Sequence, residues 1–94
     1  MPKACLRGVI LAESDEHEVV EGNIYFPPDS ISREYFTDSD LHTHCLWKGD
    51  ASYFHITVND ELSKDAAWHY PQTLDAAKHI EGYVAFWGEV EISQ

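Results

Sequence analysis

The chain has 94 residues, of which 17 are Asp or Glu and 6 are Lys or Arg, so its formal net charge is −11 at neutral pH. This acidic balance, without a basic cluster, argues against binding to nucleic acid or to a phosphate-rich membrane, because clustered Lys and Arg hold polyanions. The composition is that of a folded domain, with 44% apolar residues, and no apolar run approaches the roughly 20 residues of a membrane-spanning helix.

The length predicts one domain over residues 1–94 with a thin core, because so small a domain buries only about 60–65% of its unfolded surface. The two cysteines, Cys5 and Cys45, are too few for a four-thiolate zinc site. Without an apolar leader segment, we expect a cytoplasmic protein with reduced thiols. The sequence leaves a disulfide between the two open.

The first third of the chain predicts short strands. Brief apolar runs stand between turn residues, at residues 3–13 (interrupted at Gly8), 19–20 and 24–26. Gly22 and Asn23 separate the last two runs as the turn of a hairpin. Proline cannot donate to a sheet, so Pro27 and Pro28 end the strand. Residues 29–36 then fit either a single helical turn or a short strand.

The middle of the chain, residues 43–70, predicts three strands joined by turns at 48–50 and 59–60. Residues 53–58 give the strongest strand signal, because they are aromatic or β-branched. A two-residue loop at Gly49-Asp50 would place Cys45 on the core face of the first hairpin. The same register would gather on the opposite face His44, Leu46, Lys48, Ala51, Tyr53 and His55.

One short helix is expected near residues 74–81, between Pro71 and Gly82. Leu74, Ala77 and Ile80 have helical spacing and would face the sheet. Strands at 82–87 and 90–93 follow. Many short strands with one helix predict a mostly β, antiparallel roll or barrel without a parallel α/β core.

Four blocks of residues, in this order and spacing, cover nearly the whole chain. They are Tyr25-Phe26-Pro27, Thr43-x-Cys45-x-x-Lys48-Gly49 followed by Tyr53, Ala67-Trp68-x-Tyr70-Pro71, and Gly82-Tyr83-Val84-Ala85-Phe86. With these blocks the sequence resembles domain-of-unknown-function family 427. The resemblance implies a small antiparallel β-tent fold, similar to the Mss4-like folds, with one short helix. It implies no established activity.

The same family has been labelled nucleotidyltransferase-like, and this sequence lacks the marks of such enzymes. No Gly-Ser loop precedes an Asp-x-Asp pair that could hold two metal ions. The pairs Asp38-x-Asp40 and Glu89-x-Glu91 follow no such loop. The net charge also makes nucleotide phosphates poor guests unless a cation neutralises them.

Lys48 is the leading candidate for ligand contact. It stands beside Gly49 and is the only Lys or Arg between Arg33 and Lys64. In a partly closed β pocket, a lone ammonium could hold a carboxylate or phosphate, or, if desolvated, act as a base or a Schiff-base amine. The structural alternative is a turn lysine paired with Asp50 or another surface acid.

Four aromatic residues could line an apolar pocket around Lys48, with their polar atoms orienting a guest; these are Tyr25, Tyr53, Trp68 and Tyr70. Alternatively, they fill the thin core. Cys45 and Lys48 are the only candidates for a catalytic role, and for Cys45 the sequence favours a small buried apolar residue over a reactive thiol.

His42, His44 and His55 are lesser candidates for a metal site, because strand spacing could bring three imidazoles together. No acidic or cysteine partner at fixed spacing completes the set. The Mss4-like resemblance suggests zinc by analogy, but the paired Cys-x-x-Cys knuckles are missing. We therefore predict no metal and no cofactor.

Two functions remain open at this stage. The first is binding of a small anionic or polar ligand near Lys48, with or without catalysis. The alternative is a non-catalytic interaction domain, whose acidic and aromatic surface binds a protein partner or a second copy of the chain as a homodimer.

Overall fold

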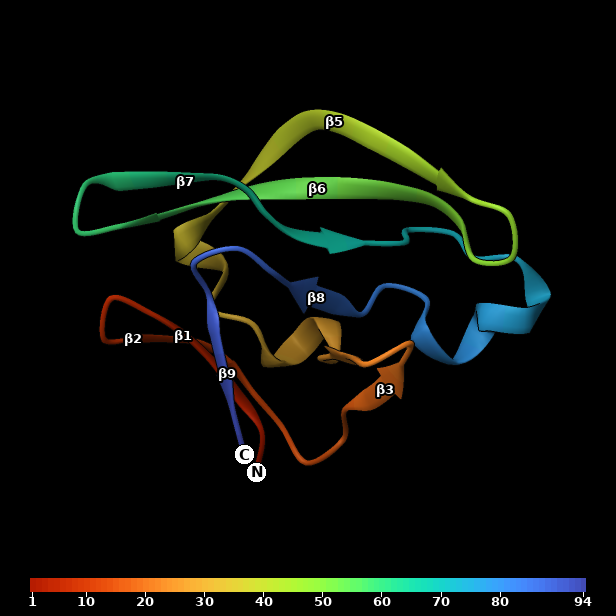
Figure 1. The fold of residues 1–94 in the computed structure, drawn as a ribbon, viewed down its shortest axis with the longest axis horizontal. Helices are drawn as coiled ribbons and strands as arrows, with labels where there is room; N and C mark the ends of the chain where they lie inside the picture. Colours follow the sequence, from red (N-terminus) through yellow and green to blue (C-terminus); the bar gives the residue numbers. More distant parts are fainter.

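The computed structural model describes residues 1–94 and contains nine strands in three antiparallel sheets (Figure 1). The first sheet has the order β2-β1-β9, with bounds Val9–Glu13, Lys3–Leu6 and Glu91–Ser93. The second pairs β3 (Glu18–Val20) with β4 (Asn23–Tyr25). The third has the order β5-β6-β7-β8, with bounds Phe36–Cys45, Gly49–Val58, Glu61–His69 and Val84–Phe86. The predicted mostly β, antiparallel fold is confirmed.

The four-stranded sheet forms one side of the molecule, and the two smaller sheets lie across from it (Figure 1). A bridge between Phe26 and Val84 joins the end of β4 to β8. The chain termini lie side by side because β9 pairs with β1. No helix in the structure has the length and apolar character needed to cross a membrane.

Three short 3-10 segments connect the strands: η1 (Pro28–Ser30), η2 (Arg33–Tyr35) and η3 (Asp75–Ile80). The third is the helix expected near 74–81, and Ala77 and Ile80 are buried as predicted. Leu74 was expected to face the sheet, which is wrong, because its side chain is 48% exposed. Its backbone is extended and its N–H donates to the carbonyl of Lys48 at 3.0 Å, so the helix begins one residue later.

The β3–β4 turn lies one residue earlier than the sequence indicated. Glu21 (φ 54°) and Gly22 (φ 81°) occupy the two turn positions, and Asn23 is the first residue of β4. Two successive residues with positive φ are typical of the tight hairpin turns that match the twist of the strands. This turn carries the side chain of Glu21 toward the β5–β6 loop, where it meets Lys48.

The predicted register of the β5–β6 hairpin is wrong. Cys45 pairs with Gly49 and Thr43 pairs with Ala51, so the loop is Leu46–Lys48. Gly49 belongs to the strand because it lies against the segment after β7 and forms a bridge with Thr73. A Cβ atom at Gly49 would stand 3.1 Å from the carbonyl oxygen of Gln72. The glycine therefore serves close backbone approach rather than the turn.

In this register, each side chain of β5 near the loop lies on the opposite face, relative to β6, from the one that was predicted. Cys45 shares a face with Ala51 and Tyr53, whereas the sequence placed it opposite them. His44 lies instead on the other face, beside its strand partner Asp50. The predicted grouping of His44 with Tyr53 is therefore wrong as well.

The core consists of two hydrophobic clusters, and the smaller one underlies the candidate site. The larger has 13 buried residues, including Phe26, Ile56 and Val84. The smaller contains Val20, Tyr25, Ala51, Tyr70, Ala77, Ile80 and Ala85. Partly buried residues packed against this smaller cluster are Cys45, Tyr53, Trp68 and Tyr83.

A bulge in β7 fixes the position of Trp87. Phe54 pairs with Ala67 and Ile56 with Ser63, so three residues of β7 face a single residue of β6. At the centre of the bulge, Asp65 has φ 53° and its N–H donates to His55 Nδ1 at 3.1 Å. Its carbonyl accepts a hydrogen bond from Trp87 Nε1. Trp87 lies just after the end of β8, and the bulge provides the carbonyl that holds its indole ring in place.

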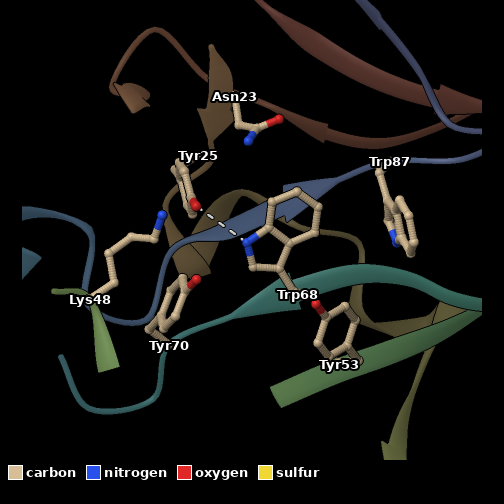
Figure 2. A pocket seen from close by; sticks show the side chains of 7 residues that line it. All are labelled: Asn23, Tyr25, Lys48, Tyr53, Trp68, Tyr70 and Trp87. Carbon is tan, nitrogen blue, oxygen red and sulfur yellow. Dashed lines mark hydrogen bonds between the residues drawn. The ribbon is translucent and has the colours of Figure 1, made fainter. Parts of the chain in front are cut away.

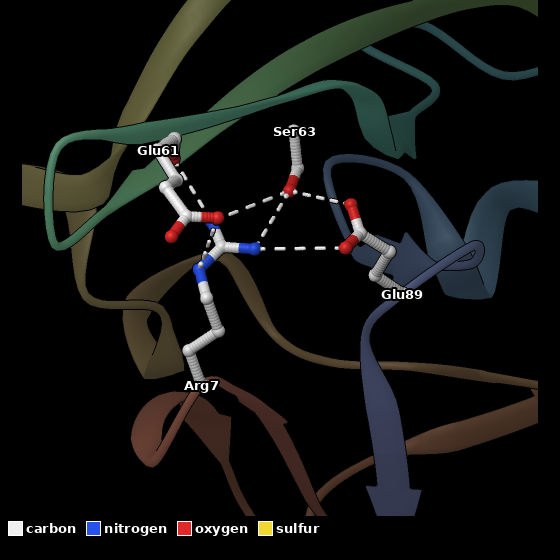
Figure 3. Close-up of polar contacts among 4 residues, drawn as sticks. All are labelled: Arg7, Glu61, Ser63 and Glu89. Carbon is white, nitrogen blue, oxygen red and sulfur yellow. Dashed lines mark hydrogen bonds and ion pairs between the residues drawn. The ribbon is translucent and has the colours of Figure 1, made fainter.

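A polar cluster around Arg7 ties the first sheet to the third (Figure 3). The Arg7 guanidinium, at the β1–β2 turn, donates to the Glu61 carbonyl at 2.9 Å and lies 3.7 Å from the Glu89 carboxylate. Ser63 donates to the same Glu89 carboxylate at 3.1 Å. These contacts connect the β1–β2 turn with β7 and with the segment before β9.

Candidate functional site

One pocket of about 240 Å³ opens among the smaller sheet, the β5–β6 loop and the third sheet (Figure 2). It brings together all five side chains that the sequence suggested for ligand contact. The lining residues are Asn23 and Tyr25 of β4, Lys48 before β6, Tyr53 of β6, Trp68 of β7, Tyr70 after β7 and Trp87 after β8. The pocket is therefore walled almost entirely by aromatic rings around one ammonium group.

Lys48 is buried, with 6% of its surface exposed, and its Nζ forms an ion pair with Glu21. The ammonium lies 4.9 Å from the ring centroid of Trp47 and 5.8 Å from that of Tyr70. Such distances allow cation–π attraction. The Lys48 ammonium thus lies beside the Tyr70 ring in the pocket and is paired with the Glu21 carboxylate.

Burial by itself acts to lower the pKa of Lys48, but the hydrogen bond to Glu21 and the nearby phenols raise it, and the net effect is a raised pKa. The same hydrogen bond lowers the pKa of the Glu21 carboxyl. Lys48 therefore stays charged at neutral pH, which suits ion pairing rather than proton abstraction. The acidic character of segment 13–21 suggests a solvated surface. Glu21, at the end of this segment, is the residue whose carboxylate contacts Lys48.

Tyr25 and Trp68 form the inner wall. Trp68 Nε1 donates a hydrogen bond of 3.2 Å to the Tyr25 hydroxyl, and the two rings meet edge to face at 6.2 Å (Figure 2). Burial raises the pKa of Tyr25, so its hydroxyl keeps its proton. Because the oxygen accepts from Trp68, the O–H remains free to donate to a guest.

Tyr70 contributes a second hydroxyl, which points toward the space between Lys48, Tyr25 and Trp68 (Figure 2). Burial is the main cause that raises the pKa of Tyr70 to about 12. None of the hydrogen bonds within the protein uses this hydroxyl, so it is a protonated donor without a partner. This hydroxyl is accessible from the pocket, although most of the Tyr70 side chain is buried, so it is a candidate ligand contact.

Tyr53 and Trp87 form the outer part of the pocket. The Tyr53 ring lies 6.4 Å from that of Trp68, and its hydroxyl is 3.2 Å from Thr43 Oγ1. The Trp87 side chain is 55% exposed, although its indole nitrogen is anchored on the bulge. An exposed indole held in place by a hydrogen bond can cover a guest without a large loss of side-chain freedom.

Three contributors to the site were missed in the sequence: Asn23, Trp87 and Glu21. Asn23 looked like a turn residue, and Glu21 belonged to a charged run. Trp87 offered the one usable signal. It follows a buried strand directly before Gly88, where a large aromatic side chain has to leave the core face.

Cys45 does not line the pocket. It is a free, half-buried thiol packed beside Ala51, Tyr53 and Tyr70 in the smaller core cluster. The imidazole of the preceding residue, His44, is hydrogen-bonded to Asp50 at 2.7 Å on the opposite face. The structure therefore gives Cys45 neither access to the pocket nor a histidine that could activate it.

The three candidate metal ligands are kept apart by their own partners. His42 Nδ1 lies 3.2 Å from Ser52 Oγ, and His55 accepts from the Asp65 backbone. His55 is also out of phase with the face that carries His42 and His44. No group of three or more His, Cys, Asp or Glu side chains is placed to hold a metal ion.

The fold and site define a small antiparallel β domain with an aromatic pocket around one buried, paired lysine. Residues 3–93 match the family model for a domain of unknown function, DUF427. The chain belongs to this family, and the resemblance seen in the sequence is confirmed. None of the curated proteins with which the chain was compared matches it.

Proposed function

We propose that the domain binds a small anionic or polar ligand in the pocket around Lys48. The observation that carries this proposal is the convergence of a buried ammonium, two inward phenols and two indoles on one cavity. A buried ammonium or hydroxyl costs free energy unless it has a hydrogen-bond partner, and an exposed indole ring costs free energy in water. Binding sites typically combine such apolar walls with a few polar groups.

The polar groups of the pocket are mostly donors. Lys48 has N–H groups beyond the one that Glu21 accepts, and the hydroxyls of Tyr25 and Tyr70 have protons to donate. Asn23 adds an amide that can donate or accept, and the hydroxyl oxygens can also accept. A guest rich in acceptor atoms would use the N–H groups of the ammonium and the O–H groups of the phenols, whereas a guest rich in donors would leave the spare ammonium N–H groups without a partner.

The arrangement supports binding better than catalysis. The ammonium is charged and paired, so it is a poor base, and Cys45 lies outside the pocket. The volume, about 240 Å³, is below the roughly 300–1,000 Å³ of pockets that enclose drug-sized molecules. The ligand is accordingly small, of the size of one ring with a substituent.

Thermal-shift screening of the full chain against short carboxylic acids, nucleobases and monosaccharides tests the proposal. A ligand that binds the folded state raises the Tm, and the rise grows with the logarithm of one plus the ratio of the ligand concentration to Kd. For any hit, Lys48→Met should weaken binding roughly tenfold or more, because a charge-assisted hydrogen bond is lost. The matched control is Lys64→Met, since Lys64 is exposed on β7. Equal binding by both variants would remove Lys48 from the site.

A second candidate function, protein interaction, is favoured by the β5–β6 hairpin. β5 is an edge of the third sheet, and Leu46 at the hairpin tip is 88% exposed. Open edges and exposed apolar tips support pairing with another chain, either a partner or a second copy. Light scattering over a concentration series, with Leu46→Ser as the comparison, tests self-association. A constant monomer mass would exclude the homodimer.

A further inference from the structure

We propose that Glu21 is a tethered occupant of the anion position in the pocket, and that the natural guest is a small aromatic carboxylate that displaces it. This inference rests on the binding function proposed above and names the chemical class of its ligand. It is argued from the placement of Glu21, the charge of the site and the shape of its walls.

Glu21 and Lys48 are unequally buried. The side chain of Lys48 is 7% exposed, whereas that of Glu21 is 55% exposed and reaches the ammonium from the solvent side. If the pair separates, the Glu21 carboxylate can be rehydrated where it stands, but the ammonium remains in an apolar hollow. A buried charge without a partner is strongly unfavourable, so Lys48 can exchange one carboxylate for another but cannot remain unpaired.

The β3–β4 turn makes this exchange mechanically simple. Glu21 sits at a hairpin turn beside Gly22, and its carboxylate is held mainly by Lys48, with a smaller contribution from the Trp47 side chain of the β5–β6 loop. Rotation of one side chain would therefore release the ammonium without disturbing a strand. The position that the Glu21 oxygen vacates is where a ligand carboxylate would have to stand.

The charge of the site favours a monoanion. Lys48 is the only cationic side chain among the lining residues, and the chain carries a net charge of −11. One carboxylate would restore the balance that Glu21 now provides, while a phosphate dianion would leave excess negative charge in an acidic protein. The hydroxyls of Tyr25 and Tyr70 can donate to the second carboxylate oxygen.

The walls favour a ring behind that carboxylate. Five of the seven lining residues are aromatic, and the rings of Tyr53 and Trp68 are tilted by 39° with centroids 6.4 Å apart. The indole of Trp87 adds a further aromatic side chain at the open, outer part of the pocket. An aromatic guest gains offset or edge-to-face contacts with such walls beyond the area it buries, whereas an aliphatic acid of equal charge does not.

Calorimetric titration of the full chain with benzoate tests the inference, using Glu21→Gln and the matched control Glu16→Gln, at an exposed position before β3. Both substitutions remove one negative charge, but only the first removes the competitor for Lys48. Benzoate should bind Glu21→Gln about tenfold more tightly than the wild type, and Glu16→Gln should match the wild type. Benzyl alcohol, which has the ring without the charge, should bind the wild type and Glu21→Gln equally.

The outcomes separate the two proposals. Benzoate binding that is lost in Lys48→Met but equal in Glu21→Gln and wild type would overturn the role of Glu21 while leaving the pocket intact. Tighter binding of acetate than of benzoate would overturn the aromatic class. No binding of any acid to wild type or Glu21→Gln would overturn the carboxylate class, and the further failure of nucleobases and monosaccharides would overturn the proposed function itself.

A second measurement uses only the wild-type protein, in case Glu21→Gln folds poorly. In a protein with carbon-13-labelled glutamate carboxyls, the Glu21 signal should titrate at a lowered pKa without ligand. At neutral pH, where benzoate is ionised, saturating benzoate should move the Glu21 carboxyl signal toward the position of an exposed, unpaired glutamate. An unchanged Glu21 signal in the benzoate-bound protein would show that the carboxylate is not displaced.

Discussion

Lys48 illustrates at the residue scale how a charged group can be kept inside a thin core. Its ammonium is held by one carboxylate and lies over two aromatic rings. The neighbouring hydrogen bond from Trp68 to Tyr25 fixes the wall that faces it. Each polar atom near the pocket is thus either paired or directed into the cavity, and replacing one of them should have a measurable cost.

Tyr25→Phe should destabilise the domain by about 1–2 kcal/mol, because it leaves the Trp68 indole N–H without its acceptor in a partly buried position. The same change at Tyr83, whose hydroxyl takes part in none of the hydrogen bonds, should stay within about 0.5 kcal/mol. Urea unfolding monitored by circular dichroism measures both values. Equal losses of unfolding free energy in the two variants would mean that the Trp68–Tyr25 hydrogen bond does not stabilise the domain.

At the element scale, the β5–β6 hairpin positions the site through Gly49 rather than through its loop. Gly49→Ala should cost about 2–4 kcal/mol, because the residue has φ 116° and its new Cβ would press on the Gln72 carbonyl at 3.1 Å. Gly8→Ala, at φ 82° with open space around it, should cost only about 1–2 kcal/mol. Thermal unfolding of both variants gives the comparison, and a Gly49 effect no larger than that of Gly8 would contradict the close approach.

The same hairpin marks the limit of what the sequence could predict. Most strand positions, the helix near 74–81 and the residue types of the pocket follow from local patterns, because β-branched and aromatic runs and turn residues act over a few positions. Residues 37–42 of β5 were missed, because they are mostly polar and exposed. The register does not, since Gly49 reads as a turn residue unless the backbone at 72–74 is known to lie against it. Glu21 and Trp87 were missed for a similar reason, because their roles arise from contacts between distant segments.

At the scale of the whole molecule, the pH dependence of stability follows from groups whose pKa values change on folding. Burial lowers the pKa of His69, whose ring is stacked on Phe54 at 4.5 Å; the Ser52 backbone and Asp38 act to raise it and Arg33 to lower it. Hydrogen bonds to Lys48 and Thr73, respectively, are the main causes that lower the pKa values of Glu21 and Glu81. These groups act in two separate pH windows.

Between the ordinary histidine pKa near 6.5 and the lowered value in the fold, the unfolded chain binds a proton at His69 that the folded chain does not. The free energy of unfolding should therefore fall as the pH drops from about 7 through this window. It should fall further from the ordinary carboxyl range downward, where the unfolded chain takes up protons at Glu21 and Glu81 that the folded chain does not yet bind. Urea unfolding at pH 7.5 and 5.5 isolates the histidine contribution. His69→Gln should flatten the dependence between those two values, while His79→Gln, at an exposed position on η3, should leave it unchanged. An undiminished slope in His69→Gln would assign the acid sensitivity of this domain to other groups.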